Sequence, residues 1–239
     1  MSGACGADTA RRRLGAALAL CLVLPVAGCT AASGGGGSSE LGLKPVTEAS
    51  SGALPTTGLG EVALSAGDVA GYTVTAPDAG ETVRQRDVRL SDAACAPVAY
   101  ALAGTVVGKS SATQIRQAAG QHPVTVVLAS YDEVAAPAAL EALSEAADTC
   151  ADGFTATVDG HAWRITDVAP RLAPEGADQA MALGALVERD GREARLDVVV
   201  LRKGGTVAYL SASGEDRADG GPDTSVPAAV LNAQLAELG

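Results

Sequence analysis

The chain has 239 residues, 47% of them apolar and a net charge of -11, which suits one folded domain and excludes wholesale disorder. No nucleic-acid partner is expected, because an acidic chain lacks the basic surface that phosphate binding needs. Aromatic residues make up only 3%, so the predicted core consists of Ala, Val and Leu.

Residues 1–28 have the pattern of an export signal, because three arginines at 11–13 precede a short apolar run at 14–26. The segment Val26-Ala27-Gly28-Cys29 resembles the bacterial lipobox, whose cysteine is diacylated through sulfur. By this resemblance Cys29 is the lipid attachment site, carrying palmitate or similar chains, and the lipoprotein is anchored to the extracytoplasmic face of the cell membrane. An ordinary secretory signal with a chance cysteine is the alternative, and either Sec or Tat export fits.

Residues 29–60 are predicted to form a lipidated flexible tether, since they are rich in Gly, Ser, Thr and Pro and lack apolar periodicity. The domain is expected over residues 61–239. Its first elements are predicted to be strands at Gly71–Thr75 and Thr82–Leu90, a helix from Ser91 or Asp92 to Gly104, a short helix at Ala112–Ala119, a buried strand at Val124–Leu128 and a helix from Pro137 to Gly153.

The second half of the domain alternates strand patterns with tight turns. Asp159-Gly160, Asp190-Gly191 and Gly204-Gly205 have hairpin spacing, which predicts an antiparallel meander. An acidic loop at 214–224 precedes a last helix carrying Leu231, Leu235 and Leu238. The predicted fold class is α+β, a twisted antiparallel sheet with flanking helices in a single domain. The strands are expected at Phe154–Val158, Trp163–Val168, Ala180–Glu188, Ala194–Leu201 and Thr206–Ala212.

Two cysteines remain in the mature domain, because Cys5 and Cys21 leave with the signal and Cys29 is acylated. Cys95 and Cys150 each lie on the apolar stripe of a predicted helix, and the expected compartment is oxidising, so a disulfide between them is predicted. Two buried free thiols are the alternative.

The sequence offers little that predicts chemistry. It contains two histidines, His122 and His161, and no nucleophile elbow, zinc-protease pair or phosphate loop. No catalytic residue, metal site or cofactor is therefore expected, and the protein is predicted not to be an enzyme.

Two spots are candidate ligand-binding sites. Arg84 and Arg86 share one face of a predicted strand, where a carboxylate or phosphate could bridge them. Their alternative role is to protect a solvated edge strand from aggregation. Trp163 is the second spot, flanked by His161 and Arg164, and its alternative role is core packing.

The order of several features resembles actinobacterial surface lipoproteins and the extracellular sensor domain of PknH-type serine/threonine kinases. These features are Gly71-Tyr72, Ala94-Cys95-Ala96-Pro97, the β-run before a helix, Cys150-Ala151-Asp152-Gly153-Phe154 and the hairpin Val198–Ala212. The resemblance implies an α+β domain with a cleft for an unknown ligand. The chain departs from that sensor domain in having one available cysteine pair where the sensor domain has two disulfides.

Three functions are compatible with these observations. The first is a sensor-like lipoprotein domain that binds an envelope ligand or protein without catalysis, and a polar cleft near Arg84, Arg86 or Trp163 would favour it. The second is a carrier of lipid or other apolar cargo, which a large Ala/Val/Leu-lined void would favour. The third is a hydrolase with an unrecognised site, which requires a His bonded to both a nucleophile and a carboxylate.

Overall fold

A computed structural model describes residues 56–78, 80–214 and 226–239, all of which lie in one compact unit, Thr47–Gly239. The predicted signal peptide, Cys29, most of the predicted tether and almost all of the acidic loop lie outside the described residues. None of the described helices is long and apolar enough to cross a membrane.

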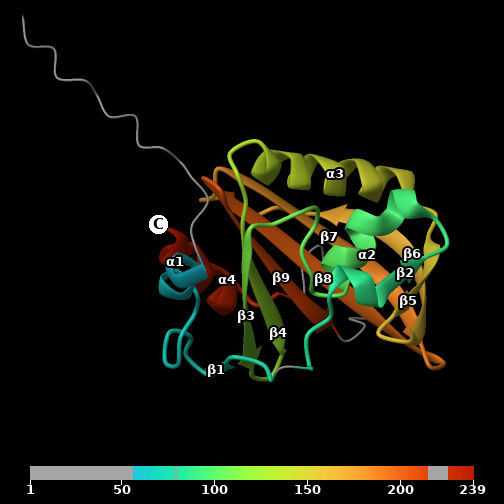
Figure 1. Cartoon of the computed structure of the whole chain (residues 1–239). Coiled ribbons are helices and arrows are strands. Elements are labelled where there is room, and N and C mark those ends of the chain that lie inside the picture. The colour runs from blue at the N-terminus through green and yellow to red at the C-terminus, as the bar shows by residue number, and fades with distance from the viewer. Residues whose placement is uncertain (1–55, 79, 215–225) are drawn as a thin grey trace, which may run out of the picture. The chain divides into compact units, whose positions relative to one another are not determined.

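The domain is built on an antiparallel sheet of nine strands in the order β1-β3-β4-β9-β8-β7-β6-β5-β2 (Figure 1). The predicted α+β fold with an antiparallel sheet is therefore confirmed. The strands are β1 Thr73–Thr75, β2 Val88–Leu90, β3 Ala112–Ala119, β4 Val124–Ser130, β5 Phe154–Val158, β6 His161–Arg171, β7 Gln179–Arg189, β8 Arg192–Lys203 and β9 Thr206–Gly214.

Helices cover both faces of this sheet (Figure 1). Alternate residues of a strand point to opposite faces, so Val198 and Val200 of β8 pack with α2 and α3. Val199 and Leu201 pack with α1 and α4 on the other side. The helices are α1 Thr56–Glu61, α2 Ala96–Leu102, α3 Ala135–Thr149 and α4 Ala228–Leu238, with 3-10 turns η1 Gln85–Asp87 and η2 Ala93–Cys95.

The hairpin turns form where the sequence predicts them. Asp159 and Gly160 have φ of 48° and 82°, and Asp190 and Gly191 have 54° and 72°. Two consecutive positive φ angles are typical of the type I′ turn, whose twist matches that of the flanking strands. The second turn therefore sets the register of β7 and β8, in which Arg189 lies directly opposite Arg192.

Two predicted elements are wrong. The segment Thr82–Leu90, expected to be one strand, is a strand only at Val88–Leu90. The 3-10 turn η1 occupies the residues just before it, and there the Arg84 N–H donates to Asp87 Oδ2 at 3.1 Å. The helix expected over Ala112–Ala119 is strand β3, which pairs with β4 over seven residues. Sheet pairing there overrides the weak helical preference of an Ala/Gln-rich segment.

The two terminal helices pack together in an arrangement that the apolar pattern did not predict. Residues 56–60 of the predicted tether belong to α1, and Leu59 is fully buried. In α4 the buried positions are Val230 and Gln234, whereas the three leucines of the predicted stripe are half-buried. The Gln234 side-chain amide donates to the Val62 carbonyl oxygen at 2.8 Å, which ties α4 to the chain following α1.

Candidate functional site

A cleft of about 850 Å³ opens on the sheet face that packs with α2 and α3, where these helices leave part of the face uncovered. Its floor comes from six adjacent strands, β3, β4, β9, β8, β7 and β6. Its walls are the end of α2, at Leu102, Ala103 and Gly104, and the segment 81–83. This volume lies within the range of roughly 300–1,000 Å³ usual for small-ligand sites.

One part of the floor is a polar row. Gln117, Thr125 and Ser211 are direct cross-strand neighbours on β3, β4 and β9, so their side chains share the cleft face. Within the described part of the chain, none of the three side chains has a hydrogen-bond partner. The wall approaches closely here, because a Cβ at Gly104 would lie 3.4 Å from Ser211 Oγ. The row therefore offers unused donors and acceptors in a confined space.

The rest of the lining is largely apolar. Trp163 is 8% exposed and lies opposite Arg189 of β7, and its indole N–H has no hydrogen-bond partner among the described residues. Trp163 belongs to the core and also lines the cleft, so core packing is confirmed and its binding role stays a prediction. Apolar neighbours in the lining are Val83, Leu102, Ile115, Val187, Ala194 and Leu196.

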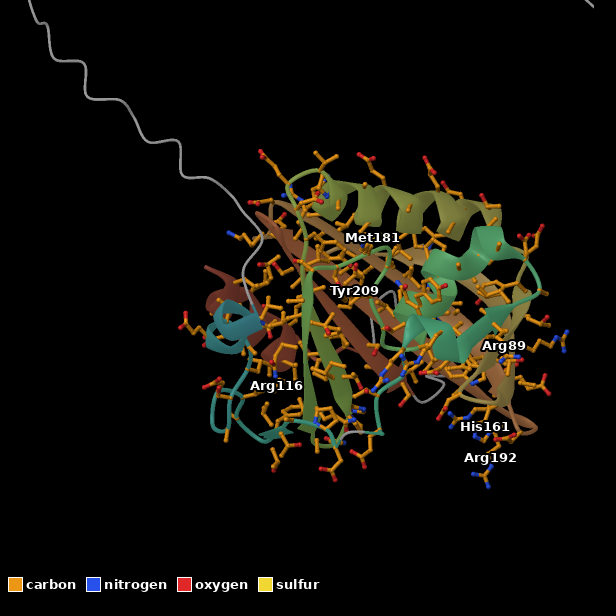
Figure 2. The ribbon with its side chains drawn as sticks, in the orientation of Figure 1. Arg89, Arg116, His161, Met181, Arg192 and Tyr209 are labelled. Atoms are coloured by element: carbon orange, nitrogen blue, oxygen red, sulfur yellow. A yellow bond between two sulfur atoms is a disulfide. The ribbon has the colours of Figure 1, made fainter. Side chains whose placement is uncertain are left out.

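Charged residues gather at the rim, at the β7–β8 turn. Arg189 and Arg192 are exposed and line the cleft, together with Glu81, Asp190 and Glu193. Figure 2 shows Arg192 and His161 at the same end of the domain, where His161 Nδ1 lies 3.5 Å from Asp190 Oδ2. The lining thus combines a charged rim, an apolar patch and a polar row.

The predicted pair Arg84 and Arg86 does not lie in the cleft. Both side chains are exposed at η1, and Arg86 Nε is 3.8 Å from Asp87 Oδ1. They no longer share a strand face, because the strand expected there is absent. Neither residue lines the cleft, although the preceding segment 81–83 does. A binding role for this pair stays a prediction.

Two buried tyrosines hold the chain that follows the cleft wall. The Tyr131 hydroxyl donates to the Val107 carbonyl oxygen at 2.7 Å and lies 2.8 Å from the Tyr209 hydroxyl. The Val107 N–H donates to Tyr209 Oη at 3.3 Å. Burial is the main cause that raises the pKa of each tyrosine above its usual value, so both hydroxyls stay protonated and available for hydrogen bonding.

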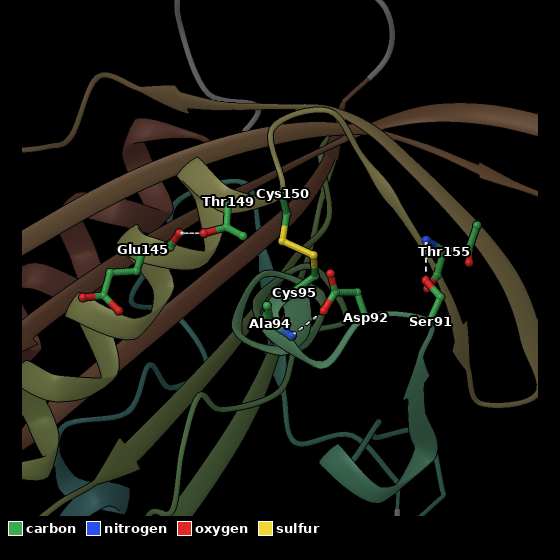
Figure 3. The surroundings of a disulfide bond; sticks show 8 residues. All are labelled: Ser91, Asp92, Ala94, Cys95, Glu145, Thr149, Cys150 and Thr155. Carbon is green, nitrogen blue, oxygen red and sulfur yellow. Dashed lines mark hydrogen bonds between the residues drawn. A yellow bond between two sulfur atoms is a disulfide. The ribbon is translucent and has the colours of Figure 1, made fainter. Parts of the chain in front are cut away.

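The predicted disulfide is present between Cys95 and Cys150 (Figure 3). It joins the residue preceding α2 to the residue following α3, with a Cα–Cα distance of 5.8 Å. The Asp92 side chain caps the same turn by accepting from the Ala94 N–H at 2.9 Å. Because α2 ends in the cleft wall, the bridge fixes the helix that shapes the cleft.

Metal-ligating side chains do not cluster in the parts of the chain that the structure describes. No group of three or more His, Cys, Asp or Glu is close enough there to hold a metal ion. The ring of His161 faces Asp190 at an exposed hairpin.

No protein-family model matches the chain, and no curated protein matches it. Among solved structures, it is similar to the extracellular domain of PknH from Mycobacterium tuberculosis, at 13% identity and a TM-score of 0.48, covering 78% of this chain and 95% of that one. It is also similar to an uncharacterized protein of Mycobacterium smegmatis, the Rv0999 ortholog, at 14% identity and a TM-score of 0.36, covering 70% and 86%. The similarity to the PknH extracellular domain is thus found as a distant structural one, whereas the lipoprotein part of that resemblance stays a prediction.

Sequence reasoning found one residue of this cleft, Trp163, and missed the others. The pair Arg189 and Arg192 had a readable signal, because a two-residue turn at Asp190-Gly191 places them opposite each other. No signal in the sequence indicated the row of Gln117, Thr125 and Ser211, because the row depends on β9 lying beside β4.

Proposed function

We propose that this domain binds a small ligand in the cleft and performs no catalysis on it. The observation that carries the proposal is the lining, in which the apolar patch around Trp163 adjoins the unused polar groups of Gln117, Thr125 and Ser211. Such a combination suits binding, because apolar contacts supply affinity and a few polar groups supply orientation. A carrier of purely apolar cargo is supported less well, since it would desolvate the polar row without replacing its hydrogen bonds.

The ligand-binding proposal is tested with the single tryptophan of the chain as a reporter. A panel of envelope lipids, muropeptides and small anions should contain at least one compound that saturably changes Trp163 fluorescence. The same compound should raise the melting temperature, because a ligand at a hundred times its Kd stabilises the fold by about 2.7 kcal/mol.

A matched pair of variants locates the binding. Ala194→Phe fills the cleft from an exposed position of β8, whereas Ala162→Phe adds the same ring at an exposed position on the opposite face of β6. Ala194→Phe should abolish the response and Ala162→Phe should retain it. The proposal would be contradicted if no compound of the panel gave a response, or if both variants responded equally. It would also be contradicted by turnover of an ester, peptide or phosphate substrate that was traced to a cleft residue.

We also propose that the domain is exported and held at the membrane by lipid on Cys29. The support is the lipobox-like segment Val26-Ala27-Gly28-Cys29 together with the Cys95–Cys150 disulfide, which is typical of oxidising compartments. Cys29→Ser should abolish labelling by a fatty-acid analogue and move the protein to the soluble fraction. Unchanged labelling of this variant would refute the anchor, and Cys21→Ser, within the signal, is the control that should keep it.

A further inference from the structure

The tip of the β7–β8 hairpin separates its charges by sheet face. Arg189 lies directly opposite Arg192, and Glu188 lies directly opposite Glu193. Residues opposite each other share a face and neighbours along a strand do not, so the two arginines are on the cleft face and the two glutamates on the other. In a chain of net charge -11, the cleft thus has two adjacent cations at its rim.

This arrangement costs stability unless something compensates for it, because like charges directly opposite on a sheet repel. Glu188 has such compensation on its own face, where Glu188 Oε2 lies 3.5 Å from Arg164 Nη1. Arg189 and Arg192 make no ion pair within residues 56–78, 80–214 and 226–239. A bound anion between the two guanidinium groups would remove the repulsion.

The acidic residues of the lining do not supply that anion. The carboxylate of Asp190 lies 3.5 Å from His161, and the carboxylate of Glu81 accepts from the Asp78 N–H at 3.1 Å. Glu193 also lines the cleft, but strand alternation directs its side chain to the opposite face of the sheet. The two arginines are therefore the cations of the lining, and neither is neutralised by these carboxylates.

An apolar patch adjoins the arginine pair. Arg189 lies opposite Trp163 on β6, and Val187, two residues earlier on β7, shares its face. Leu196 of β8 continues this patch in the cleft lining. A ligand that reaches both features has an acidic group at one end and an apolar body beyond it.

We propose that the cleft binds an anionic amphiphile, with its phosphate or carboxylate headgroup between Arg189 and Arg192 and its apolar chain over Trp163, Val187 and Leu196. The proposal rests on the proposed function, whose site it uses. Guanidinium groups suit this role, because each presents paired N–H donors that match the oxygens of a carboxylate or phosphate. The apolar chain adds affinity by leaving water.

The test compares three probes by Trp163 fluorescence, each below its micellar concentration: dodecyl phosphate, the neutral dodecyl maltoside and inorganic phosphate. Dodecyl phosphate should bind at least tenfold more tightly than either of the others, since only it uses both features. Its Kd should rise with ionic strength, because salt screens the exposed arginines.

The test variant changes both cleft arginines, and the control variant changes one arginine on the opposite face of the sheet. The double variant Arg189→Gln with Arg192→Gln should raise the Kd for dodecyl phosphate at least tenfold. Arg164→Gln removes one exposed arginine of the opposite face and should leave the Kd within twofold. All three positions are exposed, so the variants are expected to fold.

Each contrary outcome identifies what fails. Equal binding of dodecyl maltoside, or an unchanged Kd in the double variant, would overturn the arginine site and leave the cleft as a ligand site intact. Equal binding of inorganic phosphate would overturn the amphiphile. Absence of dodecyl phosphate binding would overturn this inference, and the proposed function would fall with it only if the broader panel were also inactive.

Discussion

Replacing both Cys95 and Cys150 by alanine is expected to lower the free energy of unfolding by about 4 kcal/mol. The bridge closes a loop of 55 residues, and its loss returns the corresponding conformational freedom to the unfolded chain. Both side chains are buried, and alanine avoids introducing buried hydroxyls. Urea unfolding of the variant and of the parent domain measures the difference.

The bridge also bears on the cleft, because it restrains the start of α2 while the end of α2 forms a wall. We therefore expect the double variant to show a weaker ligand response even at temperatures where it is folded. The parent domain with and without a reductant is the control for the substitutions themselves. Equal urea midpoints for the oxidised and reduced parent would contradict the predicted contribution of the bridge.

Replacing Gly184 by alanine is expected to lower the free energy of unfolding by about 3–5 kcal/mol, the range for disrupting a buried ion pair. Gly184 lies on β7 between Arg171 of β6 and Asp197 of β8, whose Nε and Oδ1 atoms are 3.8 Å apart. A Cβ there would clash with Asp197 Oδ1 and lie 2.8 Å from Arg171 Nε. The Asp197 carboxylate is fully buried, so displacing Arg171 weakens the ion pair that offsets the desolvation of this charge.

Gly60→Ala is the matched control, because a Cβ at Gly60 meets nothing within 4 Å. It adds the same methyl group in helix α1 and should leave stability unchanged or slightly higher. Thermal and urea unfolding of both variants distinguish the effect of position from the effect of the methyl group. A loss below about 1 kcal/mol for Gly184→Ala would show that the pair tolerates displacement.

Local patterns in the sequence sufficed for much of the fold. Strands β5 to β9 and helix α3 carry their own signals, namely period-two or continuous apolar runs, Asp-Gly turns and a helical apolar stripe. The disulfide was predictable because both cysteines lie on the inward face of predicted helices. The strands, turns and helix depend on residues within one turn or one strand, which is the range over which sequence determines backbone conformation. The disulfide joins residues 55 apart, and it was predictable because these two cysteines were the pair left in the mature domain.

Other features depend on contacts between distant segments. Ala112–Ala119 is a strand because it pairs with β4. The η1 turn has a local hydrogen bond from Arg84 to Asp87, and a distant contact also holds it, because Gln85 Nε2 donates to the Val106 and Gly108 carbonyl oxygens at 2.8 and 2.7 Å. The sequence predicted Trp163 as a candidate binding residue but not the cleft around it. Only the tertiary structure sets Arg189 beside Trp163, and β9 beside β4, because sheet register between distant strands depends on the whole core that they bury together.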